Sequence, residues 1–482
     1  MGHPLGGKTT AALGVMLALL AVPYATPRLA HYRIAKAPWD DAVTVDVALA
    51  QAAPAVSAPI LTQGETNLKA STNEKTVTNA LPDTPEKQAL DPKALAKTKG
   101  SIAIEDPTGK ALDAFYGQLA KTKAKQKDAV TRVMHYGDSV ITSDYISGTM
   151  RRRLQTEFGD AGHGFILTAN PWEWYFHNDV AHGASDGWSS SRITGPTTKD
   201  AMYGLGGVTF TGHPGNTAWF ATAEGAKAKY GKKVSRFDVY YLETPNGGDV
   251  EVKLEGNTET FSTVGDPPTS KVKSFHCTDG EAKLQLRVTA GNPRLFGVAL
   301  ERDESGVVYD ALGANGSRSE LLEQIADAHL KDQMDLRKPN LIVLQYGTNE
   351  SEAPFFLKEP YERHLTNVVE KMKKAAPGAS ILIASTLDRA ENTESGNLRT
   401  KPIIKKLVES QRNVAVAEGV AFFDTFEAMG GEGTMATWVK RGLAGSDLTH
   451  PSPQGAEIIG ELFYKSLSTG FEAWESRHPT AP

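Results

Sequence analysis

The chain has 482 residues, 23% of them charged, with a formal net charge of −5. This length predicts two or more structured units. The negative balance argues against a nucleic-acid-binding protein, which would present a basic face, and gives no electrostatic steering toward anionic membranes.

The first 36 residues carry a targeting signal. Lys8 precedes an apolar run from about Ala11 to Ala25. The run is long enough for the core of a signal peptide and short for a membrane span. Pro23 makes a poor cleavage site, so we favour an uncleaved anchor over cleavage. We expect an extracytoplasmic location, in the periplasm or cell envelope, with membrane contact through this segment alone.

Residues 37–100 are rich in Ala, Pro, Thr, Lys and Asp and show no sustained period. Such a composition buries too little apolar surface to fold and predicts a flexible linker.

Beyond residue 100, short apolar runs end in small or polar residues. They are "RVMHYGDS" (132–139), "PNLIVLQYGTNES" (339–351), "ASILIASTLDR" (379–389) and "GVAFFDTF" (419–426). Helical patterns separate them, such as the apolar positions within 365–372. Strands that alternate with helices predict a parallel sheet covered on both faces, with ligands at the carboxyl ends of the strands.

Residues 187–303 break this rhythm with short alternating runs and turn signals such as Asn-Gly-Gly. This pattern predicts an inserted all-β sandwich. The α/β domain is then divided into a first part, residues 101–186, and a second part, residues 304–482.

Ser139 directly follows the first strand of the α/β pattern. A serine needs a base, and the base needs a carboxylate that orients it. Asp447 and His450 supply both near the carboxyl end, just before a helix that Ser452 can cap. Gly316 and Asn349 offer a backbone N–H and a side-chain amide to an oxyanion.

Four ordered segments resemble the blocks of the SGNH, or GDSL-type, hydrolase superfamily: "YGDSV", "GANGS", "YGTNE" and "DLTH". The resemblance implies a flavodoxin-like three-layer α/β/α fold. It also implies that Ser139 is the nucleophile, His450 the base and Asp447 the residue that orients the base. Gly316, Asn349 and the Ser139 backbone N–H would form the oxyanion hole.

Two positions depart from the pattern. Val140 replaces the usual leucine and Glu350 the usual aspartate, and neither supplies a catalytic atom. The β insert is similar to the arrangement in bacterial peptidoglycan O-acetylesterases, in which a carbohydrate-binding-like module interrupts the hydrolase domain.

Two rival nucleophiles are present. Ser185 in "GASDG" matches a nucleophile elbow, although no buried strand precedes it. Cys277 adjoins His276, but neighbouring residues of a strand point to opposite faces. Cys277 is the one cysteine of the chain, which also excludes a disulfide within it.

Trp172 and Trp174 lie in an aromatic segment after the first helix. They are candidates for substrate binding by stacking on sugar rings, although packing at the insert is the commoner role of such residues. His163, His177 and His182 match no metal pattern. We therefore expect neither a metal nor a cofactor.

The sequence thus predicts a serine esterase that removes O-acetyl groups from an envelope polysaccharide such as peptidoglycan. An acyltransferase with the same triad, a lipase or thioesterase, and a catalytically inactive carbohydrate-binding protein remain alternatives. Oligomeric state is left open.

Overall fold

The centre of the fold is a sheet of five parallel strands. A computed structural model describes residues 103–224, 228–352 and 358–479. Within them the strand order is β13-β1-β14-β15-β18. Numbered along the chain, this is the 2-1-3-4-5 order of flavodoxin-like folds, as expected. The strands are β1 (Val130–Gly137), β13 (Gly306–Gly313), β14 (Leu341–Gln345), β15 (Ser380–Ala384) and β18 (Ala421–Phe423).

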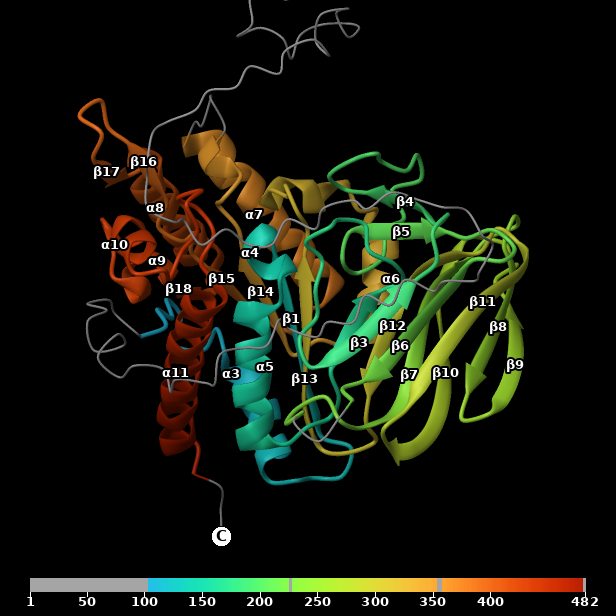
Figure 1. Ribbon diagram of the computed structural model, residues 1–482. Helices are drawn as coiled ribbons and strands as arrows, with labels where there is room; N and C mark the ends of the chain where they lie inside the picture. Colours follow the sequence, from blue (N-terminus) through green and yellow to red (C-terminus); the bar gives the residue numbers. More distant parts are fainter. Residues whose placement is uncertain (1–102, 225–227, 353–357, 480–482) are drawn as a thin grey trace, which may run out of the picture. The chain divides into compact units, whose positions relative to one another are not determined.

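Helices cover both faces of this sheet, because successive residues of each strand are apolar and point to opposite sides. Val133 packs in the cluster that holds α3, α5 and α11, whereas Met134 and Tyr136 pack in the cluster that holds α6, α7 and α8. Figure 1 shows α5 and α11 side by side on one face. The six helices are α3 (Asp113–Lys123), α5 (Tyr145–Phe158), α11 (Pro453–Arg477), α6 (Asp327–Arg337), α7 (Lys358–Ala375) and α8 (Pro402–Glu418).

Shorter elements border the carboxyl edge of the sheet. α4 follows β1 directly, and the two strands β16 and β17 form a small antiparallel pair. They and the remaining short elements are α4 (Ser139–Thr142), η2 (Ser319–Gln324), η3 (Glu350–Glu352), β16 (Ala390–Asn392), β17 (Leu398–Thr400), α9 (Thr425–Met429) and α10 (Thr434–Lys440).

The chain between β1 and β13 forms two antiparallel sheets (Figure 1). One has the order β10-β7-β12-β5-β4, with β2 also paired to β12, and the other has the order β3-β6-β11-β8-β9. β2 and β3 precede residue 187, so antiparallel pairing begins earlier in the chain than the pattern predicts. The strands are β2 (Gly164–Leu167), β3 (Val180–Ala184), β4 (Ser189–Arg192), β5 (Val208–Thr211), β6 (Thr217–Thr222), β7 (Val234–Glu243), β8 (Gly248–Leu254), β9 (Asn257–Ser262), β10 (Thr269–Gly280), β11 (Lys283–Gly291) and β12 (Arg294–Glu301).

The predicted N-terminal apolar segment, residues 1–36, and the predicted linker, residues 37–100, lie outside the described residues. Among the helices that the structure describes, none is both long and apolar enough to cross a membrane.

α4 lies against the carboxyl ends of β1 and β13, and two glycines make this approach possible. A Cβ atom at Gly137 would lie 2.4 Å from the Ile141 side chain. A Cβ atom at Gly313 would lie 2.3 Å from the backbone nitrogen of Thr142. The backbone of α4 would have to move to accept a side chain at Gly313.

Gly313→Ala should therefore lower the free energy of unfolding by about 1–3 kcal/mol, the usual cost of overpacking a buried site. Chemical denaturation measures the change. Gly378→Ala is the matched control, because a Cβ there meets no atom within 4 Å. Equal stability of the two variants would contradict this account of the α4 contact.

Candidate active site

Ser139 is the first residue of α4 and stands at the carboxyl end of β1. Its Oγ lies 2.7 Å from Nε2 of His450, although 311 positions separate the two residues. Asp138, the residue before this helix, caps it by accepting a hydrogen bond from the backbone N–H of Val140. The strand end thus presents the hydroxyl to a histidine from the last part of the chain.

His450 is held by Asp447 on the loop before α11. Nδ1 of the ring lies 2.6 Å from Oδ2 of Asp447. Oδ1 accepts hydrogen bonds from the backbone N–H groups of Thr449 and His450, both at 3.1 Å. Leu448, which lies between Asp447 and Thr449, has φ +59°. This conformation turns the chain back so that the Asp447 carboxylate faces the His450 ring.

The charge of Asp447 fixes the tautomer of the histidine. Burial raises the pKa of the Asp447 carboxyl, but hydrogen bonds from the ring and backbone of His450 and from Thr449 lower it, and the resulting pKa is about 2. An ionised carboxylate only accepts hydrogen bonds, so Nδ1 of a neutral His450 donates to it. Nε2 then keeps its lone pair and accepts the proton of the Ser139 hydroxyl.

Asp138 joins the nucleophile to the loop that carries Asn349. This carboxylate is fully buried. It accepts from the backbone N–H of Val140 and from that of Thr348, both at 3.1 Å. Burial raises the pKa of Asp138, and these hydrogen bonds oppose the shift. Sequence reasoning missed this role; the signal present was an Asp at a helix start, where it caps well.

The predicted oxyanion groups lie on two loops that are bonded to each other. The side-chain amide of Asn349 donates to the backbone oxygen of Ser317 at 2.8 Å. The neighbouring Gly316 is exposed and has φ +75°, and a Cβ there would meet no atom within 4 Å. The structure thus brings the segment that contains Gly316 to the side of Asn349.

Glu350 also joins the loop that contains Asn349 to the segment that follows Gly316. Its buried Oε1 accepts from the backbone N–H of Ser319 at 2.8 Å and from the Ser319 hydroxyl at 3.1 Å. Burial raises the pKa of Glu350 to about 7, with a smaller contribution from the Asp138 carboxyl, while the bonds from Ser319 lower it. Glu350, which stands where an aspartate is usual, is therefore a second buried acid near the site.

Arg389 connects the Asn349 loop to the histidine loop. Its buried guanidinium donates to the backbone oxygen of Thr348 at 2.7 Å and to Oγ1 of Thr449 at 2.8 Å. Thr449 is the residue whose N–H contacts Asp447. Both loops are therefore positioned by one cation, a link between distant segments that sequence reasoning missed.

The two aromatic candidates differ in their surroundings. Trp172 is half-buried against the core, and the guanidinium of Arg192 lies 6.0 Å from the centroid of its ring. The Trp174 side chain is 66% exposed. Their loop contacts the nucleophile helix, because the N–H of Phe176 donates to the backbone oxygen of Thr142 at 3.2 Å.

The rival nucleophiles occupy structural positions. Oγ of Ser185 accepts from the backbone N–H of Thr217 at 2.9 Å, in an antiparallel sheet. His276 pairs with Asp303, while Sγ of Cys277 contacts the backbone oxygen of Val234. Burial raises the pKa of the Cys277 thiol to about 11, so it is not a ready nucleophile.

Asp144, His163 and His177 have ligand atoms within 4.8 Å of one another and are the described residues that could hold a metal ion. Nδ1 of the buried His163 has no hydrogen-bond partner, but the other polar side-chain atoms of the cluster do. The buried guanidinium of Arg151 donates to both oxygens of Asp144, and Nε2 of His163 lies 2.9 Å from Nδ1 of His177. An arginine in direct contact disfavours a cation, and we assign the cluster a structural role.

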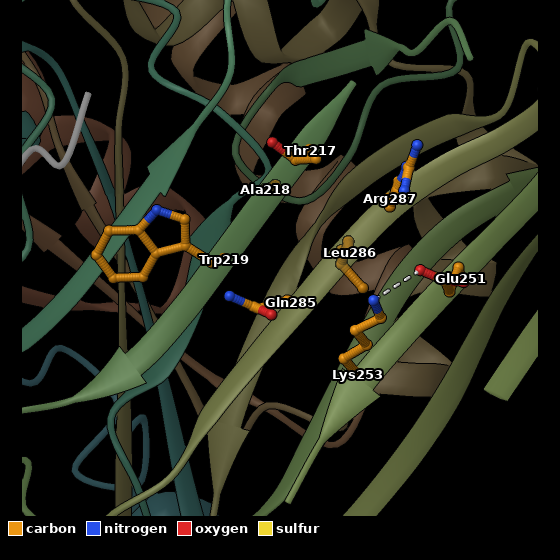
Figure 2. A pocket seen from close by; sticks show the side chains of 8 residues that line it. All are labelled: Thr217, Ala218, Trp219, Glu251, Lys253, Gln285, Leu286 and Arg287. Carbon is orange, nitrogen blue, oxygen red and sulfur yellow. Dashed lines mark ion pairs between the residues drawn. The ribbon is translucent and has the colours of Figure 1, made fainter. Parts of the chain in front are cut away.

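A hollow of about 150 Å³ lies on the outer antiparallel sheet, across β6, β8 and β11 (Figure 2). Figure 2 shows Trp219 and Gln285 on its surface beside the ion pair of Lys253 and Glu251. None of its lining residues is a predicted site residue. The residues that line it are Thr217, Ala218, Trp219, Glu251, Lys253, Gln285, Leu286 and Arg287.

Residues 277–458 match the model of the GDSL-like lipase/acylhydrolase family. The match includes Gly316, Asn349, Asp447 and His450, and Ser139 lies before it. No curated protein matches the chain.

Several solved structures are similar. One described as "Peptidoglycan O-acetylesterase in action" is 22% identical, with a TM-score of 0.66, and the alignment covers 77% of this chain and 100% of the other. A lipase/acylhydrolase from Enterococcus faecalis is 18% identical over 34% of this chain and 77% of its own, with a TM-score of 0.27. A family two carbohydrate esterase from Cellvibrio japonicus is 10% identical over 60% and 99%, with a TM-score of 0.25.

Residues 277–458 thus resemble GDSL-like lipases/acylhydrolases, and the hydrogen-bonded serine, histidine and aspartate are arranged as in serine hydrolases. The fold of the chain resembles that of a peptidoglycan O-acetylesterase.

The raised pKa of Glu350 makes the stability of the site depend on pH. The folded protein holds this proton up to about pH 7, whereas the ordinary pKa of the group is 4.5. Stability from this group is therefore full below about pH 4.5 and decreases as the pH rises to about 7. Glu350→Gln stays neutral throughout and keeps an acceptor for Ser319.

Between pH 5 and pH 8 the wild type should lose on the order of 1–3 kcal/mol more stability than Glu350→Gln. Urea denaturation at the two pH values measures the difference. Glu472→Gln, at an exposed position of α11, is the control. Parallel pH dependence of the wild type and Glu350→Gln would refute the assignment.

Proposed function

We propose that the protein is a serine esterase that removes O-acetyl groups from an envelope polysaccharide such as peptidoglycan. The observation that carries this proposal is the hydrogen-bonded series Ser139–His450–Asp447 at the carboxyl edge of the sheet. This is the geometry of a nucleophile, a base and the group that orients the base.

In the proposed reaction, Oγ of Ser139 attacks the acetyl carbonyl while Nε2 of His450 takes the hydroxyl proton. The ionised Asp447 stabilises the imidazolium. His450 then gives the proton to the sugar oxygen as the ester C–O bond breaks, which leaves an acetyl group on Ser139. Water, deprotonated by His450, attacks this acyl-enzyme. Acetate leaves and the serine is regenerated.

The oxyanion of each tetrahedral intermediate would be bound by three N–H donors: the backbone groups of Ser139 and Gly316 and the amide of Asn349. The bonds of Asp138 to Val140 and Thr348, and of Asn349 to Ser317, support this assignment, because they fix the three loops in place before substrate arrives. Donors that need no reorganisation at the moment of reaction contribute most to rate.

A polymeric substrate is supported by the openness of the site. The side chains of His450 and Asp447 are 43% and 51% exposed. An ester on a large glycan can reach such a histidine from solvent, whereas a long acyl chain would call for an apolar tunnel. The structural likeness to a peptidoglycan O-acetylesterase points to the same class of substrate.

We further propose that the two antiparallel sheets form an inserted carbohydrate-binding-like β sandwich, and that residues 1–36 direct the protein to the periplasm or cell envelope as an anchor or signal peptide. Detection of the full chain in cell fractions, with and without residues 1–36, tests the location. Recovery of both forms in the cytoplasm would exclude it.

Loss of the nucleophile should abolish activity. Ser139→Ala is expected to lower the rate of acetate release on the order of 10⁶-fold, because the members of such a triad act as a unit. Purified full-length chain is assayed on 4-nitrophenyl acetate and on O-acetylated peptidoglycan. Ser185→Ala is the matched control and should keep its activity.

Each outcome decides between functions. Release from both substrates that depends on Ser139 supports the proposal. Release from the small ester alone keeps the chemistry and rejects this polymer. Transfer of acetyl to an added acceptor sugar without net release would identify an acyltransferase. Binding of peptidoglycan without turnover by folded protein would identify an inactive carbohydrate-binding protein.

A further inference from the structure

Trp174 is an exposed aromatic side chain, whereas the other tryptophans that the structure describes are buried or partly buried. The sequence has seven tryptophans, of which six lie in the described residues. Among those six, Trp174 alone is classed as exposed, at 66%. It makes no hydrogen bond or ring contact with any residue that the structure describes. The exposed indole ring has an apolar face that is free to stack on a sugar ring.

Backbone contacts place the loop that carries Trp174 near Ser139. Phe176, two residues later, donates its N–H to Thr142, the last residue of the helix that Ser139 begins. A helix of this length spans about 4.5 Å, and two residues of chain reach at most about 7 Å. The backbone of Trp174 therefore lies within roughly 15 Å of Ser139.

A buried network anchors the residue that follows Trp174. The side chain of Tyr175 is 2% exposed, and its hydroxyl accepts from the backbone N–H of Leu167 at 2.8 Å. The same hydroxyl lies 2.7 Å from Nε2 of His177, whose Nδ1 lies 2.9 Å from His163. Burial lowers the pKa of His177 to about 4, so the network stays uncharged.

A second attachment follows a few residues on. The backbone N–H of Asn178 donates to Oδ2 of Asp144 at 2.8 Å, and Asp144 is itself paired with the buried Arg151. The loop is therefore fixed on the residues that follow Trp174, while the ring itself stays free. A platform held in this way loses little conformational freedom when a ligand binds.

Other tryptophans near possible binding surfaces do not offer a free ring face. Trp219, at the hollow of Figure 2, is 6% exposed, and Nζ of Lys283 lies 4.2 Å from its ring centroid. Trp172 packs on the core with Arg192 over its ring. Of the two tryptophans that the sequence singles out, the structure leaves only Trp174 available for stacking.

We propose that Trp174 forms a sugar-binding subsite in which its ring stacks on a saccharide of the polymer strand beside the acetylated residue. The inference rests on the proposed function, because it assumes that the substrate is a glycan. The apolar face of a sugar ring covers the indole, and the anchored loop keeps this contact in register with Ser139. A small ester carries no such sugar and does not use the subsite.

The test compares full-length wild type with Trp174→Ala and Trp174→Phe on O-acetylated peptidoglycan and on 4-nitrophenyl acetate. Trp174→Ala should raise the apparent KM for the polymer about 10- to 100-fold, the range expected for a lost aromatic contact. It should leave kcat/KM for the small ester within about twofold. Trp174→Phe keeps an aromatic face and should recover most of the affinity. Val416→Ala, at another exposed apolar position, is the control.

A second measurement does not depend on turnover. Ser139→Ala and Ser139→Ala/Trp174→Ala are incubated with insoluble peptidoglycan, and the bound fraction is measured after sedimentation. Binding by the single variant and its loss in the double variant support the subsite. The subsite is rejected if Trp174→Ala changes neither the KM for the polymer nor the bound fraction. It is also rejected if Trp174→Ala lowers activity equally on the polymer and on the small ester. Neither result contradicts the proposed function. If the wild type neither hydrolyses nor binds peptidoglycan, both the proposed substrate and the subsite are rejected.

Discussion

The close approach of α4 to the ends of β1 and β13 is the constraint on which the site depends. A side chain at Gly137 or Gly313 would overlap α4, so two glycines let a four-residue helix lie across the sheet edge. Ser139 begins that helix, Asp138 caps it, and Thr142 at its end meets the loop that carries Trp174. The packing of α4 against β1 and β13 thus determines the positions of Ser139, of Asp138 and of the loop that carries Trp174.

Around this helix, three acids have different environments and different tasks. Asp447 is half-exposed and accepts from His450 and two backbone N–H groups, which keeps it charged beside the base. Asp138 and Glu350 are buried, and each crosses from one loop to another. Burial raises the pKa of Asp138 and Glu350, whereas hydrogen bonds from His450 and Thr449 outweigh partial burial and lower the pKa of Asp447. Charge is therefore kept where proton transfer is proposed and is disfavoured where the loops are joined.

Local pattern was enough to predict the parallel sheet and the residues that meet at its edge. Apolar runs that end in polar residues predict that Ser139 and Asn349 follow strands, and in the structure they follow β1 and β14. The ordered motifs predict that Ser139 and His450 act together, and their side chains are hydrogen-bonded. The pattern missed β2 and β3 as members of the antiparallel sheets, because "VAHGA" and its neighbours lack β-branched alternation. It also missed Arg389, whose partners are backbone and hydroxyl oxygens far along the chain. The different exposure of Trp172 and Trp174 depends on tertiary packing, which spacing alone does not encode.

The distribution of the triad along the chain has a consequence for the time at which activity arises. Ser139 belongs to the first strand of the sheet, whereas Asp447 and His450 lie on the loop before α11, which packs against α5. During synthesis, Ser139 and the strands of both antiparallel sheets leave the ribosome before Asp447 and His450 are made. In the proposed mechanism, Ser139 has no proton acceptor until α11 docks, so the nascent chain would not attack esters.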